Sequence, residues 1–240
     1  MEYENVSQAI FIDRPSRFIA KVELNGVVVD AHIKNTGRCK EILVPGACVH
    51  VALAKNPDRA TKYDLICVTK EDRLINIDSQ APNRVFFEYL QSGQFIDGIT
   101  HIKPEFKHGA SRFDFYVEAR ERKVLIEVKG VTLEKDGIAS FPDAPTDRGI
   151  KHLNHLANSI KDGFEAHVVF IIKMQDITHF EPNNAIQPEF AQAVKNTQTQ
   201  GVKIHAYDCL VTPTTLNINK PVKVIMQNNP PRPAPPSARK

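Results

Sequence analysis

Two apolar stretches decide how the second half of the chain folds: Phe113-Asp114-Phe115-Tyr116 and Val124-Leu125-Ile126-Glu127-Val128-Lys129-Gly130. Both are rich in β-branched and aromatic residues, which predicts two neighbouring strands joined through a short charged segment. Because side chains alternate along a strand, Glu127 and Lys129 share one face, and a hairpin pairing brings Asp114 beside Glu127. An acidic side chain in so apolar a strand is costly unless it is paired or binds a cation.

These two acids and the lysine predict a divalent-metal site. Two carboxylates offer the oxygen ligands that Mg²⁺ or Mn²⁺ prefers, and such a metal activates water and offsets the charge that develops on a phosphodiester. Lys129 is expected to orient that water and to stabilise the transition state, and Glu105, which precedes the first strand, is a candidate third carboxylate. The pattern is short, and the competing interpretation is a solvated face, which is the usual setting for Glu and Lys two positions apart on a strand.

A helix is predicted over residues 146–162, because Ile150, Leu153, Ala157 and Ile160 recur at helical spacing, with Thr146 or Asp143 as N-cap and Gly163 as the stop. Polar and basic groups gather at its start and along one side: Thr146, Asp147, Arg148, Lys151, His152 and His155. The N-terminal amides and Arg148 suit a phosphate. Three interpretations stay open for the two histidines: a solvated helix face, phosphate contact and, least favoured, zinc ligation.

The remaining patterns divide the chain near residue 80. After a short helix at 85–90 and a connector at 93–98, strands at 112–118, 124–129, 168–172 and 202–207 alternate with helices at 146–162 and 189–199, which predicts an α/β or α+β domain around a mixed sheet. Before residue 80, turn residues separate short strands at 18–24, 27–33, 47–54, 63–68 and 74–77. Asn25-Gly26 predicts a type I′ hairpin. About five short strands predict a small β-barrel of the oligonucleotide/oligosaccharide-binding (OB) type, which commonly binds extended polymers.

Composition limits the alternatives. The 240 residues, 42% hydrophobic and 25% charged, suffice for one large domain or two small ones, and a formal charge of +3 places any nucleic-acid affinity in local patches. Basic groups in the loops of the first region and around the predicted helix are candidates for phosphate contacts, with an ordinary solvated surface as the alternative. The candidate nucleic-acid-binding residues are Arg17, Lys34, Arg38, Arg84, Arg112, Thr146, Arg148 and His152. Further basic groups in these loops are Arg14, Arg59, Lys62 and Arg73.

Other features concern the setting of the chain. The charged N-terminal segment and the absence of a long apolar run predict a soluble, cytoplasmic protein without a membrane partner. The four cysteines lack metal-ligand spacing, which predicts reduced and buried thiols. The proline-rich segment 228–240 is predicted to be disordered.

The pattern of Asp114, Glu127 and Lys129 resembles the core motif of PD-(D/E)XK nucleases, and longer segments resemble the sugar fermentation stimulation protein (SfsA) family. Those segments are Ser111–Phe115, Glu127–Leu133, Phe141–Gly149, Lys151–Leu153, Arg17-Phe18, His32, Asn35–Arg38, Pro45-Gly46 and Ala81-x-Asn83-Arg84. The resemblance implies an OB-like barrel over 1–80, a nuclease-like domain over 81–227, catalytic roles for the two acids and the lysine, and DNA binding linked to sugar-utilisation genes. Lys34 departs from the family, where a proline is expected.

Two functions follow as hypotheses. The first is a Mg²⁺- or Mn²⁺-dependent nuclease acting on DNA or RNA, with Asp114, Glu127 and Glu105 as metal ligands. The second is a DNA-binding regulator of sugar-utilisation genes that keeps the site geometry without turnover. A carbohydrate- or anion-binding barrel is a third reading, and the sequence also permits a homodimer.

Overall fold

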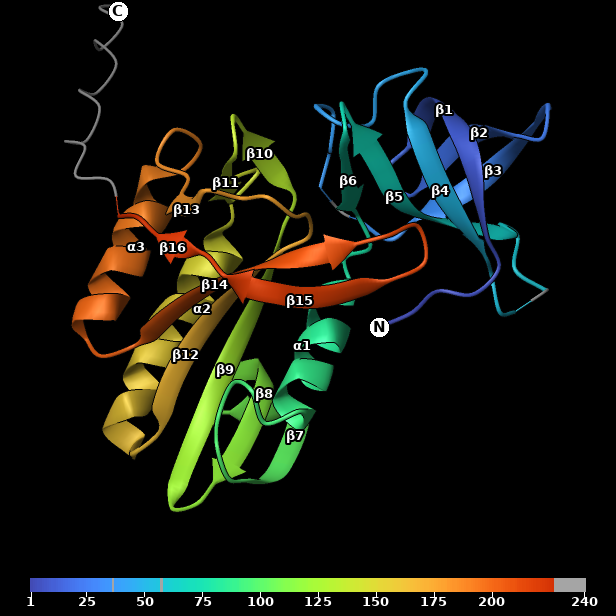
Figure 1. The fold of residues 1–240 in the computed structure, drawn as a ribbon. Coiled ribbons are helices and arrows are strands. Elements are labelled where there is room, and N and C mark those ends of the chain that lie inside the picture. The colour runs from blue at the N-terminus through green and yellow to red at the C-terminus, as the bar shows by residue number, and fades with distance from the viewer. Residues whose placement is uncertain (36, 57, 227–240) are drawn as a thin grey trace, which may run out of the picture.

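Residues 1–35, 37–56 and 58–226 are described from a computed structural model (Figure 1). The first region is a β-barrel and the second is a mixed sheet covered by helices on both faces. The barrel strands are β1 (Val6–Ser16), β2 (Ile19–Leu24), β3 (Val27–Ile33), β4 (Cys48–Leu53), β5 (Tyr63–Lys70) and β6 (Arg73–Asn76). The helices of the second region are α1 (Ala81–Gln91), α2 (Asp147–Ser159), which continues into a 3-10 turn (Ile160–Asp162), and α3 (Pro188–Thr199).

The barrel closes through five strands in the order β3-β2-β1-β4-β5, because β5 also pairs with β3. The predicted hairpin is confirmed: Leu24 pairs with Val27, and Asn25 and Gly26 both have positive φ. The predicted set of five barrel strands was wrong in its membership. β1 was not predicted, and β6, which was predicted as a barrel strand, lies outside the closed ring. Asp13 and Pro15 break the apolar alternation of β1, and register irregularities follow Phe11, so the strand has a weak sequence signal.

The second region is built on a six-stranded sheet in the order β15-β14-β12-β9-β8-β7. Its strands are β7 (Ile99–His108), β8 (Ser111–Ala119), β9 (Arg122–Val131), β12 (Glu165–Ile172), β14 (Lys203–Val211) and β15 (Leu216–Pro221). A smaller sheet joins β10 (Leu133–Lys135), β11 (Ile138–Phe141), β13 (His179–Pro182) and β16 (Lys223–Val224). β12 runs parallel to both β9 and β14, whereas the β7–β8, β8–β9 and β14–β15 pairs are antiparallel, so the sheet is mixed, as predicted.

The predicted helices are present, with altered limits. Thr146 caps α2, and Gly163 ends the following turn with φ of 85°, as the sequence indicated. The first helix is longer than the predicted 85–90, because Pro82 fits the first helical turn, where its missing N–H costs nothing. β7 and the small sheet were not predicted, since β7 is largely exposed and lacks a regular apolar alternation.

The two regions pack on a shared core. One cluster of buried apolar side chains runs from the barrel, for example Ile75 and Ile77, into the sheet, for example Val131 and Phe170. Lys70 and Arg73 of the β5–β6 hairpin pair with the buried carboxylate of Glu134 on β10. The barrel is therefore fixed against the edge of the second region by apolar contact and by ion pairs.

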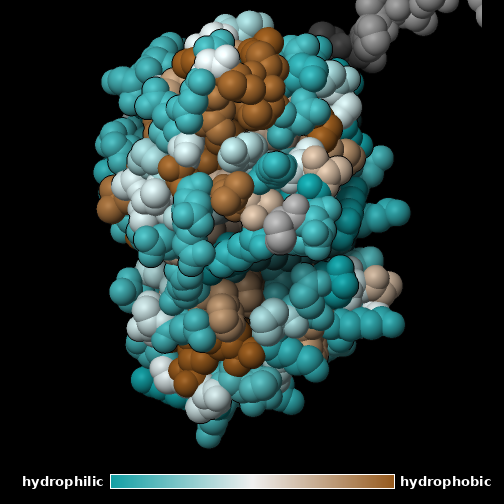
Figure 2. Space-filling model, turned by 90° about the vertical axis from the view of Figure 1, so that its right-hand side faces the viewer, coloured by the Kyte–Doolittle hydropathy of each residue, from teal (hydrophilic) through white to brown (hydrophobic). Residues whose placement is uncertain are grey.

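The predicted reduced cysteines are confirmed: all four are free, Cys39, Cys67 and Cys209 are buried, and Cys48 is half-buried. Within the described ranges, no helix has both the length and the apolar character that crossing a bilayer requires. The predicted disordered tail, 228–240, lies outside the described residues. Hydrophilic side chains cover most of the barrel-side face, with a few apolar groupings between them (Figure 2).

Candidate active site

Asp114 lies where β8 and β9 separate. The last described backbone pair between these strands joins Phe115 to Ile126, while β9 continues beside β12 as far as Val131. Oδ2 of Asp114 accepts a hydrogen bond from the Val128 amide at 2.7 Å, so the carboxylate replaces the missing strand partner. The other oxygen, Oδ1, accepts from Nδ2 of Asn83 at 2.8 Å. The carboxylate is thereby held at the point where the sheet opens.

Glu127 is buried, with 2% of its surface exposed, and its two oxygens differ. Oε1 contacts both Nζ of Lys129 and Nδ1 of His152. Oε2 is buried and has no hydrogen-bond partner. Burial raises the pKa of Glu127, but Lys129 and His152 together outweigh burial and hold the pKa below its ordinary value. Glu127 is therefore a charged carboxylate with one oxygen left without a partner.

The pKa of Asp114 shifts in the opposite direction. Burial raises it, the charge of Glu127 raises it further, and Lys129 and the hydrogen bonds from Val128 and Asn83 only partly offset this. The Asp114 carboxylate therefore lies within electrostatic reach of a second carboxylate. The predicted grouping of Asp114, Glu127 and Lys129 is present, and a cation would relieve the repulsion between its two acids.

A hollow of about 280 Å³ opens over these side chains. Five further predicted site residues line it beside the acid–lysine set: Glu105, Arg112, Thr146, Arg148 and His152. Asn83, which was not predicted, also lines it. Asn83 and the contact of His152 with Glu127 were missed, because each depends on a helix packing onto the strands. The only earlier signal for Asn83 was its place in the Ala81-x-Asn83-Arg84 segment.

The start of α2 forms one wall of this hollow. Oγ1 of Thr146 accepts a hydrogen bond from the Gly149 amide at 3.0 Å, and the Thr146 amide donates to Oε1 of Gln187. Arg148 is exposed, and its Nε lies 3.4 Å from Nε2 of His152. Thr146 is therefore a helix cap, whereas Arg148 remains open to the solvent side of the hollow.

The two histidines of α2 have different partners. His152 is largely enclosed and contacts Glu127, so it is not part of a solvated face, whereas Nδ1 of His155 contacts Oγ of Ser111. In the described part of the chain, no group of three His, Cys, Asp or Glu side chains is arranged to hold a metal by itself. A cation here would therefore be coordinated by Asp114, Glu127, water molecules and a bound substrate.

Glu105 lies opposite Asp114, since the pairs Pro104–Phe115 and Phe106–Phe113 flank it. Its Oε2 forms an exposed ion pair with Nε of Arg112 at 2.7 Å. Glu105 thus lies at the rim of the hollow, and its role as a third metal ligand stays a prediction.

The predicted basic residues of the barrel lie in two other hollows. Arg17 and Arg38 line one together with Lys40, whereas Lys34 and Arg84 line another. The Arg14 guanidinium is committed to four backbone carbonyls, those of Arg17, Asn35, Gly37 and Arg38. Arg14 therefore organises the barrel loops rather than offering a free charge to a phosphate.

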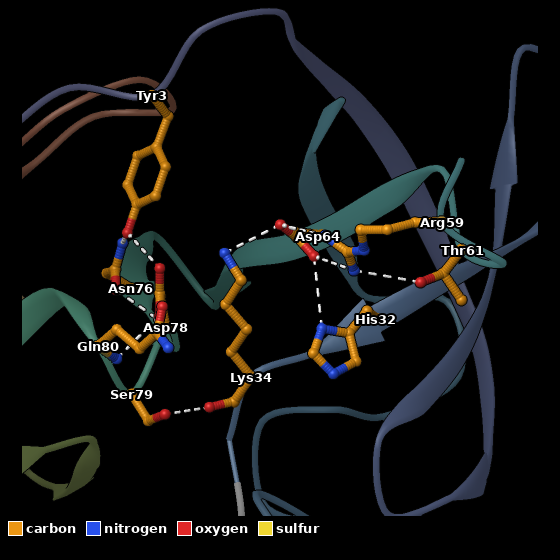
Figure 3. A network of polar contacts seen from close by, with 10 residues as sticks. All are labelled: Tyr3, His32, Lys34, Arg59, Thr61, Asp64, Asn76, Asp78, Ser79 and Gln80. Carbon is orange, nitrogen blue, oxygen red and sulfur yellow. Dashed lines mark hydrogen bonds and ion pairs between the residues drawn. The ribbon is translucent and has the colours of Figure 1, made fainter. Parts of the chain in front are cut away.

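Lys34 belongs to a cluster of charges around Asp64 (Figure 3). The two carboxylate oxygens of Asp64 accept from Arg59 at 2.9 and 3.3 Å, and Nζ of Lys34 lies 2.9 Å from Oδ2. Nδ1 of His32 lies 3.4 Å from Oδ1. Burial raises the pKa of Asp64, but Arg59 and Lys34 together hold it below its ordinary value. Lys34 therefore has a structural partner in addition to any ligand.

The fold and the site define a class: an OB barrel followed by a mixed-sheet α/β domain that places two acids and a lysine at a strand junction. Family models match both parts of the chain, "SfsA N-terminal OB domain" over residues 12–77 and "Sugar fermentation stimulation protein RE domain" over residues 80–215. The chain belongs to the sugar fermentation stimulation protein family.

Individual relatives are similar to this chain over almost its whole length. Sugar fermentation stimulation protein homologues from Ruminiclostridium cellulolyticum and Clostridium beijerinckii are 49% and 50% identical, over 93% and 94% of this chain and 99% and 100% of theirs. The solved structure of Pyrococcus furiosus SfsA in complex with Ca²⁺ is similar with a TM-score of 0.85 and 26% identity, covering 94% of this chain and 98% of that one.

Proposed function

We propose that this protein is a divalent-metal-dependent phosphodiesterase that acts on nucleic acids, with DNA as the first candidate substrate. The observation that carries the proposal is the buried Oε2 of Glu127, which has no hydrogen-bond partner. A second carboxylate, that of Asp114, is close enough for the charge of Glu127 to raise its pKa. A buried carboxylate oxygen without a partner is costly, and a cation shared by both acids removes that cost.

The donor set fits Mg²⁺ or Mn²⁺. Asp114 and Glu127 would hold the cation, with Glu105 as the further candidate once it leaves Arg112, and carboxylate oxygens are the ligands that hard cations prefer. When bound, the metal supplies an activated water and offsets charge on a phosphoryl oxygen. The Ca²⁺ in the Pyrococcus furiosus relative supports a site for hard cations in this family.

The side chains around the acids supply the rest of the chemistry. The Lys129 ammonium, which is largely enclosed, donates to the attacking water and to a phosphate oxygen that gains charge. Arg148 and the N-terminal amides of α2 bind a phosphate oxygen. Water adds to phosphorus and the bond to the leaving oxygen breaks, so that one phosphodiester and one water give one phosphomonoester and one hydroxyl.

The barrel would contribute affinity. Arg17, Arg38 and Lys40 share a hollow that also reaches Ala144, just before α2. A strand that leaves the active site over this loop would pass these cations, whose contacts with phosphates should make binding strongly dependent on salt. A homodimer stays a prediction from the sequence.

The test is incubation of the purified protein with labelled single- and double-stranded DNA and RNA, in Mg²⁺, Mn²⁺ or EDTA. We expect metal-dependent products with the wild type, none in EDTA, and none with Asp114→Ala. Lys123→Ala, an exposed change at the far end of β9, is the matched control and should keep the activity. Binding without cleavage in every condition would instead favour the non-catalytic regulator, and products that survive Asp114→Ala would exclude this site.

A further inference from the structure

Lys173 is a buried lysine that lies immediately after β12, at the junction of the two domains. Only 2% of its surface is exposed. Its amide donates to the Val131 carbonyl of β9, and its own carbonyl accepts from the Asn76 amide of β6. Its ammonium donates one hydrogen bond, to the Asp78 carbonyl at 3.0 Å, and no ion pair of Lys173 is found among the described residues.

The charge of Lys173 is thus poorly compensated. Asp78, whose charge acts on Lys173, has its carboxylate engaged by the Tyr3 hydroxyl and the Gln80 amide (Figure 3). An ammonium carries three donors, and burying it with a single carbonyl as partner is costly. Burial lowers the pKa of Lys173, and Asp78 opposes this only in part. An anion that enters from outside would satisfy the remaining donors.

A cavity of about 190 Å³ offers room for such an anion, against about 30 Å³ for one water in the liquid. Lys173, Thr132 and Ser140 contribute polar groups to its lining. Asp143 also lines the cavity, but this carboxylate is exposed and lies against Gly37, on the barrel side. The ammonium is therefore enclosed, whereas Asp143, the one acid in the lining, is exposed to solvent.

This cavity adjoins the active-site hollow. Four residues line both: Ser79, Pro82, Gly130 and Phe141. A Cβ atom at Gly130 would lie 2.6 Å from Pro82 Cγ and 3.6 Å from Lys173 Cε, so only glycine fits against Pro82 where the two spaces adjoin. A chain of phosphates that passes the acids can therefore place one group in each space.

We propose that the Lys173 cavity is a second phosphate subsite, which takes the phosphate group next to the cleaved one on the substrate strand. The assignment of that phosphate to a nucleic acid strand rests on the proposed function, whereas the affinity of the cavity for a phosphate group does not. The ligand is either an internal phosphodiester or the terminal phosphate of a strand end.

The first experiment measures phosphate binding without turnover. Thermal unfolding is followed in EDTA with increasing inorganic phosphate, at constant ionic strength set with chloride. All proteins in this experiment carry Arg148→Ala, which removes the phosphate contact proposed for that side chain in the active site. In this background we expect phosphate to raise the melting temperature of the parent protein and of Asp114→Ala, but not of Lys173→Met, which keeps the length of the side chain without its charge. Lys123→Met is the matched control and should respond like the parent protein.

A second variant guards against loss of folding in Lys173→Met. Ser140→Leu fills the cavity from β11 and leaves Lys173 in place, so it should also abolish the response to phosphate. A response that persists in either folded variant would overturn the subsite. A parent protein that does not respond to phosphate at all would overturn it equally.

The second experiment locates the phosphate on the strand. Binding is measured in Ca²⁺ for oligonucleotides in which single phosphates are replaced by neutral methylphosphonates, and for oligonucleotides with and without terminal phosphates. Neutralising the phosphate that lies in the cavity should weaken binding about 10- to 100-fold in the wild type, the range expected for a hydrogen bond to a charged group, and should leave Lys173→Met unchanged.

The position that responds separates the two sources. An internal position identifies a neighbouring phosphodiester, and a terminal position identifies a strand end. If Asp114→Ala retains cleavage while the phosphate response depends on Lys173, the proposed function fails and the subsite stands. Equal losses in the wild type and in Lys173→Met at every position would contradict the assignment to the substrate strand.

Discussion

Asp64 in the barrel and Glu127 in the mixed sheet are both buried carboxylates that lie against a lysine and a histidine, yet their oxygen atoms are used differently. Both oxygens of Asp64 accept hydrogen bonds from Arg59, and Lys34 reinforces one of them. In Glu127 a single oxygen serves both Lys129 and His152, and the other has no partner.

This difference separates a structural ion cluster from a ligand site. Both carboxylate oxygens of Asp64 have partners, so its contribution is to hold the barrel strands and the loop that bears Arg59 together. In the Glu127 cluster one carboxylate oxygen still lacks a partner, which a bound cation would provide. Asp114 supplies a second acid for the same cation. Mutations in the Glu127 cluster should therefore impair metal-dependent cleavage, whereas mutations in the Asp64 cluster should lower only the stability of the fold.

The largest effect is expected from Glu127→Gln. The change removes the charge that would hold the cation, so metal-dependent cleavage should fall to the level measured in EDTA. The change also removes the charge that Lys129 and His152 face at Oε1, so the melting temperature in EDTA should fall while the variant stays folded. Cleavage rates in Mg²⁺ and thermal unfolding in EDTA check both parts, and a variant that is active or unfolded contradicts this comparison.

Glu134 provides a third buried carboxylate, one that joins the two domains. Although burial raises its pKa, the Gly137 amide, Lys70 and Arg73 together lower it from 4.5 to about 2. Because the folded-state pKa is depressed, Glu134 stabilises the protein above pH 4.5, and this contribution is lost as the pH falls from 4.5 towards 2. The difference corresponds to on the order of 3 kcal/mol.

Denaturant unfolding at several pH values checks this. Glu134→Gln should be less stable than the wild type at pH 7, and the gap should close as the pH falls through this range. Glu121→Gln, an exposed change, serves as the control. A gap that is independent of pH would contradict the role of the Glu134 charge.

His152→Asn tests the positioning of Glu127. The imidazole contacts Oε1, and loss of such a partner behind a metal ligand costs about 10- to 100-fold in metal affinity or activity. Asn154→Ala, on the exposed side of the same helix, should leave both unchanged. Metal titration together with cleavage rates measures the effect, and an unchanged metal affinity in His152→Asn would remove this histidine from the site.

The smallest effect is expected from Asp64→Asn. The variant leaves Arg59 and Lys34 without their carboxylate, and because both cations are partly exposed we expect a loss of about 2 kcal/mol, below the 3–5 kcal/mol of a fully buried pair. Asp30→Asn, which breaks the exposed Lys21–Asp30 pair, should cost about 0–1 kcal/mol. Denaturant unfolding measures both, and cleavage per folded molecule should stay constant.

Much of the local structure could be predicted from the sequence, because single residues determine it. Asn25-Gly26 dictates its turn, Thr146 caps its helix, and the alternation of β9 places Glu127 beside Lys129. The acids also met at a strand pair, as predicted, since the two strands follow one another along the chain.

Contacts between distant segments could not be predicted. Asn83 reaches Asp114 only because α1 packs on the sheet, and Lys173 is buried only because the barrel covers the end of β12. Arg14 looked like an exposed cation, but the loops fold around it. In each case the side chain gains its role from contacts with segments distant in the sequence, which no local periodicity reports.

Calorimetric titration with Mn²⁺ tests the central claim most directly. Wild type, Glu127→Gln and Asp64→Asn are compared at neutral pH in the absence of nucleic acid. We predict saturable Mn²⁺ binding by the wild type and by Asp64→Asn, and none by Glu127→Gln. Binding by Glu127→Gln equal to that of the wild type would contradict the claim that the unpartnered carboxylate oxygen marks the metal site.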